Sequence, residues 1–297
     1  MVGGKMEKNI TKVDKGFVFF SYTMLALFSL LVAIPIINLV SVSVSGMSHV
    51  LSGNIQIWPK DFQIEAYKYV LSSKEFFMAL NNSLYITFFG TILGVFLSVM
   101  AAYPLSKIHL PGRNKIMILF VFTMMFNGGI IPQYILMNKL GLLNNLWAVI
   151  LPLSINVFNM LIVKNYFESI PEDIEEAAKI DGANQFTILI RVMLPLAIPV
   201  IATISLFYVV MYWNEYFYSR LFINEFTEIP LQVYLRMVIF EAMDPAGNFA
   251  LSNANVKLAP QSIINTTVVL SMLPMIILYP FLQRFLLKGM IIGSVKG

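Results

Sequence analysis

"MALNNSLYITFFGTILGVFLSVMAAYPL" (residues 78–105) contains no acidic or basic residue. A helix of about 20 apolar residues is long enough to cross the hydrocarbon core of a bilayer. Lipid offers no hydrogen-bond partners, so a segment that crosses it alone must pair its own backbone groups, as an α-helix does. The stretch therefore predicts a transmembrane helix.

Similar apolar runs recur along the chain. Of its 297 residues, 58% are hydrophobic and 12% are charged, whereas soluble domains carry about 25% charged residues. The pattern predicts an all-α, polytopic membrane helix bundle with six transmembrane helices. We expect a short N-terminal segment at 1–16 and one transmembrane domain at 17–297. The predicted spans are 17–42, 78–105, 114–137, 146–166, 195–219 and 262–287.

The distribution of basic residues predicts the orientation, because lysine and arginine favour the cytoplasmic side. With both termini inside, thirteen of the 20 basic residues lie inside and seven outside. Trp58, Trp147 and Trp213 then lie in outer loops or at outer helix ends, which suits the preference of indole for the interface. We expect both termini in the cytoplasm. The two longer outer loops, 43–77 and 220–261, either meet a folded partner or only cap the bundle.

Several kinds of chemical site are missing from the sequence. It contains no cysteine and no G-x-x-x-x-G-K-[ST] loop, the motif that binds ATP phosphates. Its two histidines, His49 and His109, are far apart and have no cluster of metal ligands around them. The net charge of +4 is modest and suggests membrane orientation rather than nucleic-acid binding. We expect no metal, cofactor or catalytic site in this chain.

Two other classes of membrane protein are alternatives to a passive transport subunit. A membrane enzyme acting on lipid or polysaccharide would show clustered acids, histidines or metal ligands at one membrane face. An ion-coupled carrier usually needs ionisable residues within its spans, and Glu215 is the only acid in a predicted span. Both alternatives are disfavoured, and transport powered by another protein is favoured.

Acidic residues concentrate in the loop at 167–194. Ser169 and Glu172 have the spacing of a capping box, and Pro171 suits a first helical turn. Gly182 can take a left-handed conformation that ends this helix, and a second helix is expected from about Asn184. We expect that second helix to run into the fifth span. The element either transmits force from a cytoplasmic partner or is an amphipathic helix resting on its own loops.

One face of the expected helix carries Ile174, Ala177, Ala178 and Asp181, at helical spacing. Its first three positions are small or apolar, so another surface can approach the backbone closely. The glutamates beside it can meet basic groups.

The motif in this loop resembles one in a known family. Glu176-Ala177-Ala178, three residues, Gly182, nine residues and then "VMLP" (192–195) resemble the EAA motif of ABC importer permeases. Val192 stands where the family usually has isoleucine. The stretches 58–71, 82–107, 127–145 and 281–297 resemble the maltose-type second permease, and the chain is most similar to permeases for complex oligosaccharides such as alginate or rhamnogalacturonan fragments.

The resemblance implies partners and roles. The helix would dock in a cleft on an ATPase subunit, and two such subunits would form the ATPase dimer that binds ATP and Mg. A second homologous permease, an extracytoplasmic solute-binding protein and an oligosaccharide complete the system in a bacterial inner membrane. The C-terminal tail, Val295, Lys296 and Gly297, either reaches toward the ATPases or is a frayed end. The coupling residues implied are Glu175, Glu176, Ala177, Ala178, Asp181, Gly182, Ala183, Leu194 and Pro195.

A path for sugar needs polar groups and flat apolar faces within the bundle. Asn214 and Tyr218 are four apart and are expected to share a helix face, with Glu215 beside them. The alternative is that these tyrosines form the interfacial belt and that the asparagines join helices. The candidates for the solute path are Asn127, Tyr134, Tyr212, Asn214, Glu215, Tyr218 and Asn265.

Overall fold

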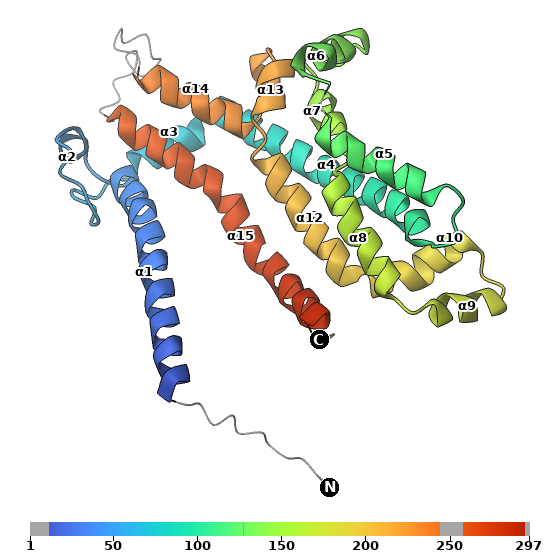
Figure 1. Ribbon diagram of the computed structural model, residues 1–297. Helices are drawn as coiled ribbons and strands as arrows, with labels where there is room; N and C mark the ends of the chain where they lie inside the picture. Colours follow the sequence, from blue (N-terminus) through green and yellow to red (C-terminus); the bar gives the residue numbers. More distant parts are fainter. Residues whose placement is uncertain (1–11, 127, 244–257, 295–297) are drawn as a thin grey trace. The chain divides into compact units, whose positions relative to one another are not determined.

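The computed structural model describes residues 12–126, 128–243 and 258–294 (Figure 1). The chain divides into two compact units. Unit one contains residues 1–70 and 244–269, and unit two contains residues 71–243 and 270–297. Of the predicted functional residues, Asn127, Val295, Lys296 and Gly297 lie outside the described part, as does most of the segment 1–16.

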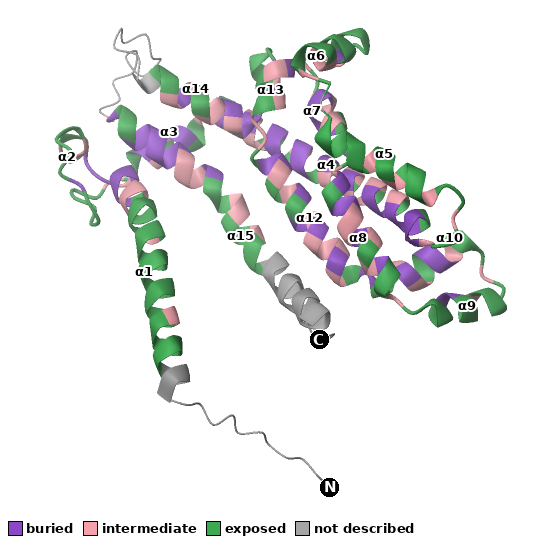
Figure 2. Ribbon diagram, viewed as in Figure 1, coloured by how far each residue is buried: buried purple, intermediate pink, exposed green. Residues whose placement is uncertain are grey.

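Unit one holds α1 (Lys12–Ser43), α2 (Met47–Leu51), most of α3 (Glu65–Ser72) and the first turns of α15 (Pro260–Ser294). Its polar contacts gather where α1 ends. The Ser43 hydroxyl pairs with the phenol of Tyr67 at 2.8 Å, and the Ser43 carbonyl accepts from Thr266 at 3.4 Å. Ser45 and Phe62 form an isolated antiparallel bridge. The apolar side chains along α1 are exposed, as the green colour in Figure 2 shows. Such a surface suits lipid rather than water.

Unit two contains the remaining helices. They are α4 (Lys74–Ser106), α5 (Arg113–Met125), α6 (Ile130–Lys139), α7 (Trp147–Leu153), α8 (Val157–Ser169), α9 (Glu172–Ile180), α10 (Gln185–Ile188), the π-helix η1 (Leu189–Met193), α11 (Leu194–Leu196), α12 (Ile198–Trp213), α13 (Phe217–Phe222), the 3₁₀ helix η2 (Phe226–Glu228) and α14 (Leu231–Met243).

Helices α4, α8 and α12 pack together as the centre of unit two (Figure 1). α4 and α12 approach closely because α4 presents glycines to tyrosine rings. A Cβ atom on Gly90 would lie 2.5 Å from the ring of Tyr212, and one on Gly94 would lie 2.6 Å from the ring of Tyr208. Small residues at such contacts are typical of helix packing in membranes. The two glycines therefore set the spacing of α4 and α12.

The described helices support the predicted fold class. Three are long and apolar enough to cross a membrane: Gly16–Ser43, Lys74–Ser106 and Pro260–Pro280. Three bent helix pairs pass the same test together, so the described residues contain up to six spans by length and composition. The chain is an all-α membrane helix bundle.

The fourth predicted span, 146–166, is bent by 48° between α7 and α8. Pro152 lies inside α7. Tyrosines of α12 bind the backbone around the break: the Tyr208 hydroxyl accepts from the Asn156 N–H at 3.0 Å, and the Tyr212 hydroxyl donates to the Ile150 carbonyl at 3.0 Å. A broken helix at membrane depth needs such partners, because lipid supplies none.

Candidate functional site

Helix α9 follows α8 after a short turn. α8 ends at Ser169, and α9 begins at Glu172 after Pro171. The Ser169 hydroxyl donates to the Tyr166 carbonyl at 2.7 Å, and no side chain caps the start of α9. The predicted capping box is therefore wrong. Ser169 still belongs to α8, and its hydroxyl bonds back into that helix.

The turn after α9 has the conformation that the sequence predicts. Gly182 has a φ of +83°, and the N–H of Ala183 donates to the Ala178 carbonyl at 3.0 Å. The side chain of Asn184 then accepts from the N–H of Thr187 at 2.8 Å and caps α10. The left-handed C-cap and the helix start at Asn184 are both confirmed.

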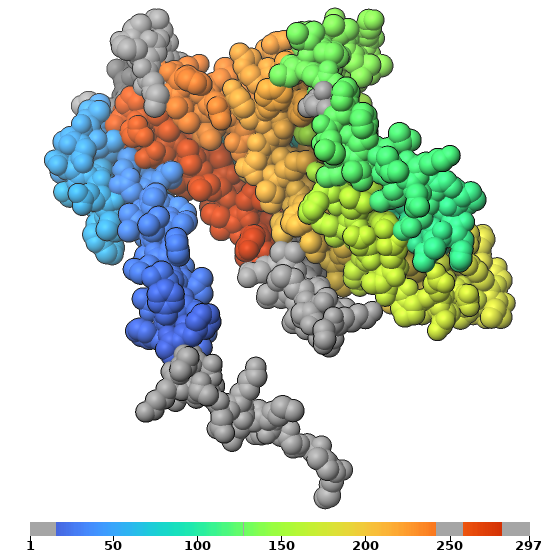
Figure 3. Space-filling model, viewed as in Figure 1, coloured from blue at the N-terminus to red at the C-terminus, as the bar shows by residue number. Residues whose placement is uncertain are grey.

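α9 has an outward face and an inward face. Glu176 and Ala177 are exposed, and Ile180 is 87% exposed. Ala178 packs partly against the core beneath, and Glu175 is buried. The two glutamates expected to flank one docking face therefore point to different surroundings. In Figure 3 the segment around α9, coloured yellow-green to yellow, lies at one end of unit two.

Glu175 forms an ion pair with Lys107, which stands at the C-cap of α4. The side chain of Glu175 is 9% exposed and that of Lys107 is 32% exposed. The Lys107 ammonium also lies 4.4 Å from the centre of the Tyr103 ring. Glu175 is thus engaged within its own chain rather than free for a partner.

A second ionic contact joins the neighbouring elements. Arg113, at the start of α5, contacts Glu168 near the end of α8. Glu168 also binds Lys164 at 2.7 Å, and Nε of Arg113 donates to the Leu105 carbonyl at 2.8 Å. The loop between α4 and α5 is thereby held against α8. In the sequence, Lys107 and Arg113 only indicated orientation, because their acidic partners lie far along the chain.

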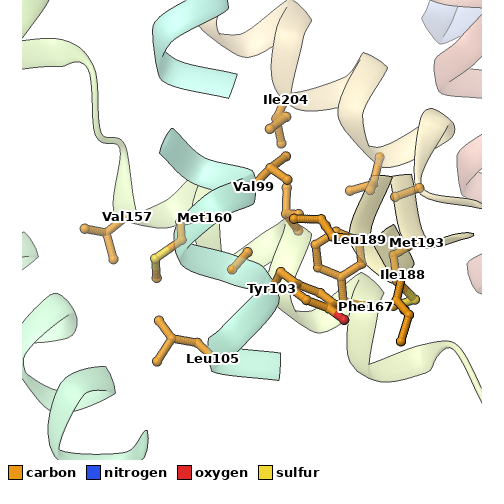
Figure 4. Packing of buried hydrophobic residues seen from close by; sticks show 14 residues of the cluster. Val99, Tyr103, Leu105, Val157, Met160, Phe167, Ile188, Leu189, Met193 and Ile204 are labelled. Carbon is orange, nitrogen blue, oxygen red and sulfur yellow. The ribbon is translucent and has the colours of Figure 1, made fainter. Parts of the chain in front are cut away.

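An apolar core supports the ion pairs. The rings of Tyr103 and Phe167 meet edge to face, with their centres 5.8 Å apart. Figure 4 shows them beside Ile188, Leu189 and Met193, all five buried. A cavity of about 1070 Å³ opens between the end of α4, the end of α8 and the segment α9–α10. The segment that carries α9 is therefore packed on α4 and α8.

The junction between α10 and α12 differs from the prediction. The sequence predicted one helix running through Pro195 into the fifth span. The structure has a π-helix at Leu189–Met193, then α11, and an 81° bend at Ala197 before α12. A proline has no N–H, and its ring clashes with the carbonyl four residues earlier, so it interrupts the preceding turn of a helix. Pro195 follows the π-helix, and Pro199 follows the bend at Ala197.

Comparison with known proteins identifies the class of this chain. The family described as "Binding-protein-dependent transport system inner membrane component" matches residues 6–292. The chain belongs to this family. It is a multi-pass membrane permease of an ABC transporter. This transport subunit has no ATP site of its own, and a separate protein hydrolyses the ATP. This membership excludes the membrane enzyme and the ion-coupled carrier.

The permease is similar to two proteins of Bacillus subtilis and to a transporter of known structure. The polygalacturonan/rhamnogalacturonan transport system permease protein YtcP of Bacillus subtilis is 40% identical, over 93% of this chain and 96% of that protein. Protein LplC of the same organism is 41% identical over 89% of each chain. A crystal structure of a bacterial ABC transporter involved in the import of the acidic polysaccharide alginate matches with a TM-score of 0.86 and 35% identity, over 92% of this chain and 98% of that one.

The C-terminal end of α12 departs from the arrangement expected for the permease. α12 ends at Trp213, and α13 begins at Phe217. Asn214 and Tyr218 therefore lie on either side of a break, and the prediction that they share a helix face is wrong. Glu215 lies in this break, where its carboxylate accepts from the Tyr218 N–H at 2.6 Å. The carboxylate thus provides a hydrogen-bond acceptor for a backbone N–H that has no partner within a helix at the break.

The remaining described candidates for the solute path have three different kinds of contact. Tyr212 is buried, and its hydroxyl donates to the Ile150 carbonyl of α7. Tyr134 and Tyr218 both stack on Phe222, with ring centres 6.4 and 5.8 Å away. In unit one, Asn265 is buried and accepts from Gln261 at 3.3 Å.

Proposed function

We propose that this permease forms half of the membrane pathway of an ATP-driven importer of oligosaccharides from complex polysaccharides. Relatives named for polygalacturonan, rhamnogalacturonan and alginate support this substrate class. The family description supports dependence on an extracytoplasmic solute-binding protein. A second homologous permease supplies the other half of the pathway.

The exposed surface of α9 is the observation that carries the proposal. Glu176, Ala177 and the turn at Gly182 are exposed, and the residues beneath them are packed on α4 and α8. A protruding helix on a rigid base suits a cleft in an ATPase subunit, which binds ATP and Mg. Glu176 pairs with basic groups there, and the small side chain of Ala177 permits close contact.

The same docking role extends to the residues around the turn and beyond it. Asp181 and Gly182 are exposed, and Ala183 is half-buried. Leu194 and Pro195 belong to α11, at the bend that leads into α12. Glu175 acts indirectly, because it is bound to Lys107. We include the tail Val295–Gly297, which lies outside the described residues, in the proposed contact with the ATPases.

We place α9 and both termini in the cytoplasm and the break at 214–216 on the outer side of a bacterial inner membrane. The excess of lysine and arginine on the α9 side supports this orientation. The solute path includes Asn127, Tyr134, Asn214, Glu215, Tyr218 and Asn265.

Purification of the permease from its native membrane tests the proposal. We expect an ATP-hydrolysing subunit to co-purify with it, and deletion of the permease to abolish hydrolysis stimulated by the solute-binding protein. Purification without any ATPase, or stimulated hydrolysis that persists without the permease, would overturn the proposal.

A further inference from the structure

The loop that carries α9 contacts one face of α4 twice: once before the turn at Gly182 and once after it. Tyr103 and Lys107 are four residues apart, so they lie on the same face of α4. Lys107 contacts Glu175 on α9, before the turn at Gly182. The Tyr103 hydroxyl donates to Oε1 of Gln185 on α10, after the turn, at 3.0 Å. Both arms of the loop are therefore attached to α4.

The contact between Lys107 and Glu175 differs from an ordinary surface ion pair. Exposed pairs contribute little, because water screens them. Glu175 is almost fully buried, and a buried carboxylate that loses its partner is strongly unfavourable. The ring of Tyr103 adds a cation–π contact to the Lys107 ammonium. Replacement of either partner, with α9 still packed on α4, would therefore leave an uncompensated charge at this contact.

The backbone joins α9 directly to α8 through a two-residue turn, but the connection that follows the loop, toward α12, is less direct. Between α10 and α12 lie a π-helix and the 81° bend at Ala197. α4, by contrast, is a single helix of 33 residues. It contacts α12 through the hydrogen bond between Ser98 and Tyr208. Movement of α9 thus reaches the bundle through α4 without crossing the bend.

We infer that Tyr103, Lys107, Glu175 and Gln185, here called the α4 clamp, fasten the α9 loop to α4. α4 then receives the displacement of α9 through these side chains, in addition to α8, which receives it through the backbone. The inference rests on the proposed docking of α9 to an ATPase. The four side chains are positioning residues. They hold the docking surface in place and need no contact with ATP or solute.

Charge reversal tests the clamp in the assembled transporter. Lys107→Glu and Glu175→Lys each place like charges together, whereas the double variant restores an opposite pair. We expect each single variant to keep its ATPase but to transport at least about fivefold less oligogalacturonate per ATP, the lower end of typical coupling effects. The double variant should recover most of the loss. Lys115→Glu, at an exposed site on the same side, is the matched control and should have no such effect.

A distance measurement separates fastening from general damage and needs no knowledge of the solute. Because the chain has no cysteine, spin labels can be attached at Phe88 on α4 and Asp173 on α9, which are both exposed. We expect one narrow distance that is unchanged when nucleotide is trapped. Lys107→Glu should broaden it, and the charge swap should narrow it again.

The outcomes distinguish this inference from the proposed function. A broad or nucleotide-dependent distance with the clamp intact, or a swap that restores neither distance nor transport, would overturn the clamp. If no ATPase is bound to the permease, the proposed docking of α9 is wrong. The distance measured in the labelled single and double variants would still test whether the clamp fastens α9 to α4. Normal ATP hydrolysis without uptake of oligogalacturonate, in unaltered protein, would reject only that substrate.

Discussion

The hydroxyls of Tyr208 and Ser98 are 2.8 Å apart, and both side chains are fully buried between α12 and α4. The same Tyr208 hydroxyl accepts from the N–H of Asn156, where the fourth predicted span breaks. One phenol therefore joins three elements that are distant in the sequence.

Tyr208→Phe should destabilise the permease by about 1–3 kcal/mol, because it leaves the Asn156 N–H and the Ser98 hydroxyl without their partner. Thermal unfolding in detergent measures the loss. Tyr22→Phe is the control, since Tyr22 is 70% exposed on α1. Equal unfolding temperatures for the two variants would show that the buried hydroxyl contributes nothing.

Gly94→Ala should separate α4 from α12, because the new Cβ would lie 2.6 Å from the Tyr208 ring. Overpacking of this kind costs about 1–3 kcal/mol, and reduced yield of folded protein measures it. Gly16→Ala adds the same methyl group to α1 at a site with no atom within 4 Å. If both alanines are tolerated alike, the close packing of α4 and α12 is not required.

Glu176→Lys and Gly182→Asp should uncouple uptake from ATP hydrolysis while the permease stays inserted in the membrane. The first reverses a charge on the exposed face of α9. The second adds charge where φ is +83°, a conformation that costs a side chain about 1–2 kcal/mol. Uptake and ATP hydrolysis measured together in proteoliposomes check this.

Gly112→Asp is the matched control for the Gly182 variant. Gly112 has a φ of +76° and open space around it, as Gly182 does, but it lies in the loop between α4 and α5. Its replacement should cost similar stability and leave coupling intact. Normal uptake by both the Glu176 and Gly182 variants, with normal ATPase association, would refute the docking role of α9.

Single cysteines at Ser48 and Ser169 should react with impermeant thiol reagents from opposite sides of the membrane. Both positions are exposed, and the distribution of basic residues predicts that Ser48 lies outside and Ser169 inside. Intact and permeabilised cells distinguish the two sides. Labelling of both cysteines from the same side would contradict the proposed orientation.

Asn214→Ala and Tyr218→Ala should slow sugar uptake roughly twofold to tenfold, the range expected for one net hydrogen bond. Basal ATP hydrolysis and assembly should be unchanged. Tyr212→Phe is a useful contrast. Tyr212 binds the Ile150 carbonyl, so its replacement should lower stability rather than transport alone. Normal uptake by both alanine variants would place the solute path elsewhere.

The apolar runs determined the membrane helices, because an isolated segment in lipid has to pair its own backbone as a helix. The left-handed turn was predictable from Gly182, since glycine alone adopts positive φ without a steric cost. The motif around Glu176 indicated the family, which the match over residues 6–292 confirmed. Each of these features depends on residues that are close together in the sequence.

Only the tertiary structure decided which residues are paired. Glu175 and Glu176 are adjacent and identical in chemistry, yet one is buried against Lys107 and the other is exposed. Lys107 is 68 positions from Glu175, and Ser98 is 110 positions from Tyr208. Such contacts depend on which helix ends meet across the bundle. The break after Trp213 is stabilised locally instead, because the Glu215 carboxylate accepts from the Tyr218 N–H three residues later.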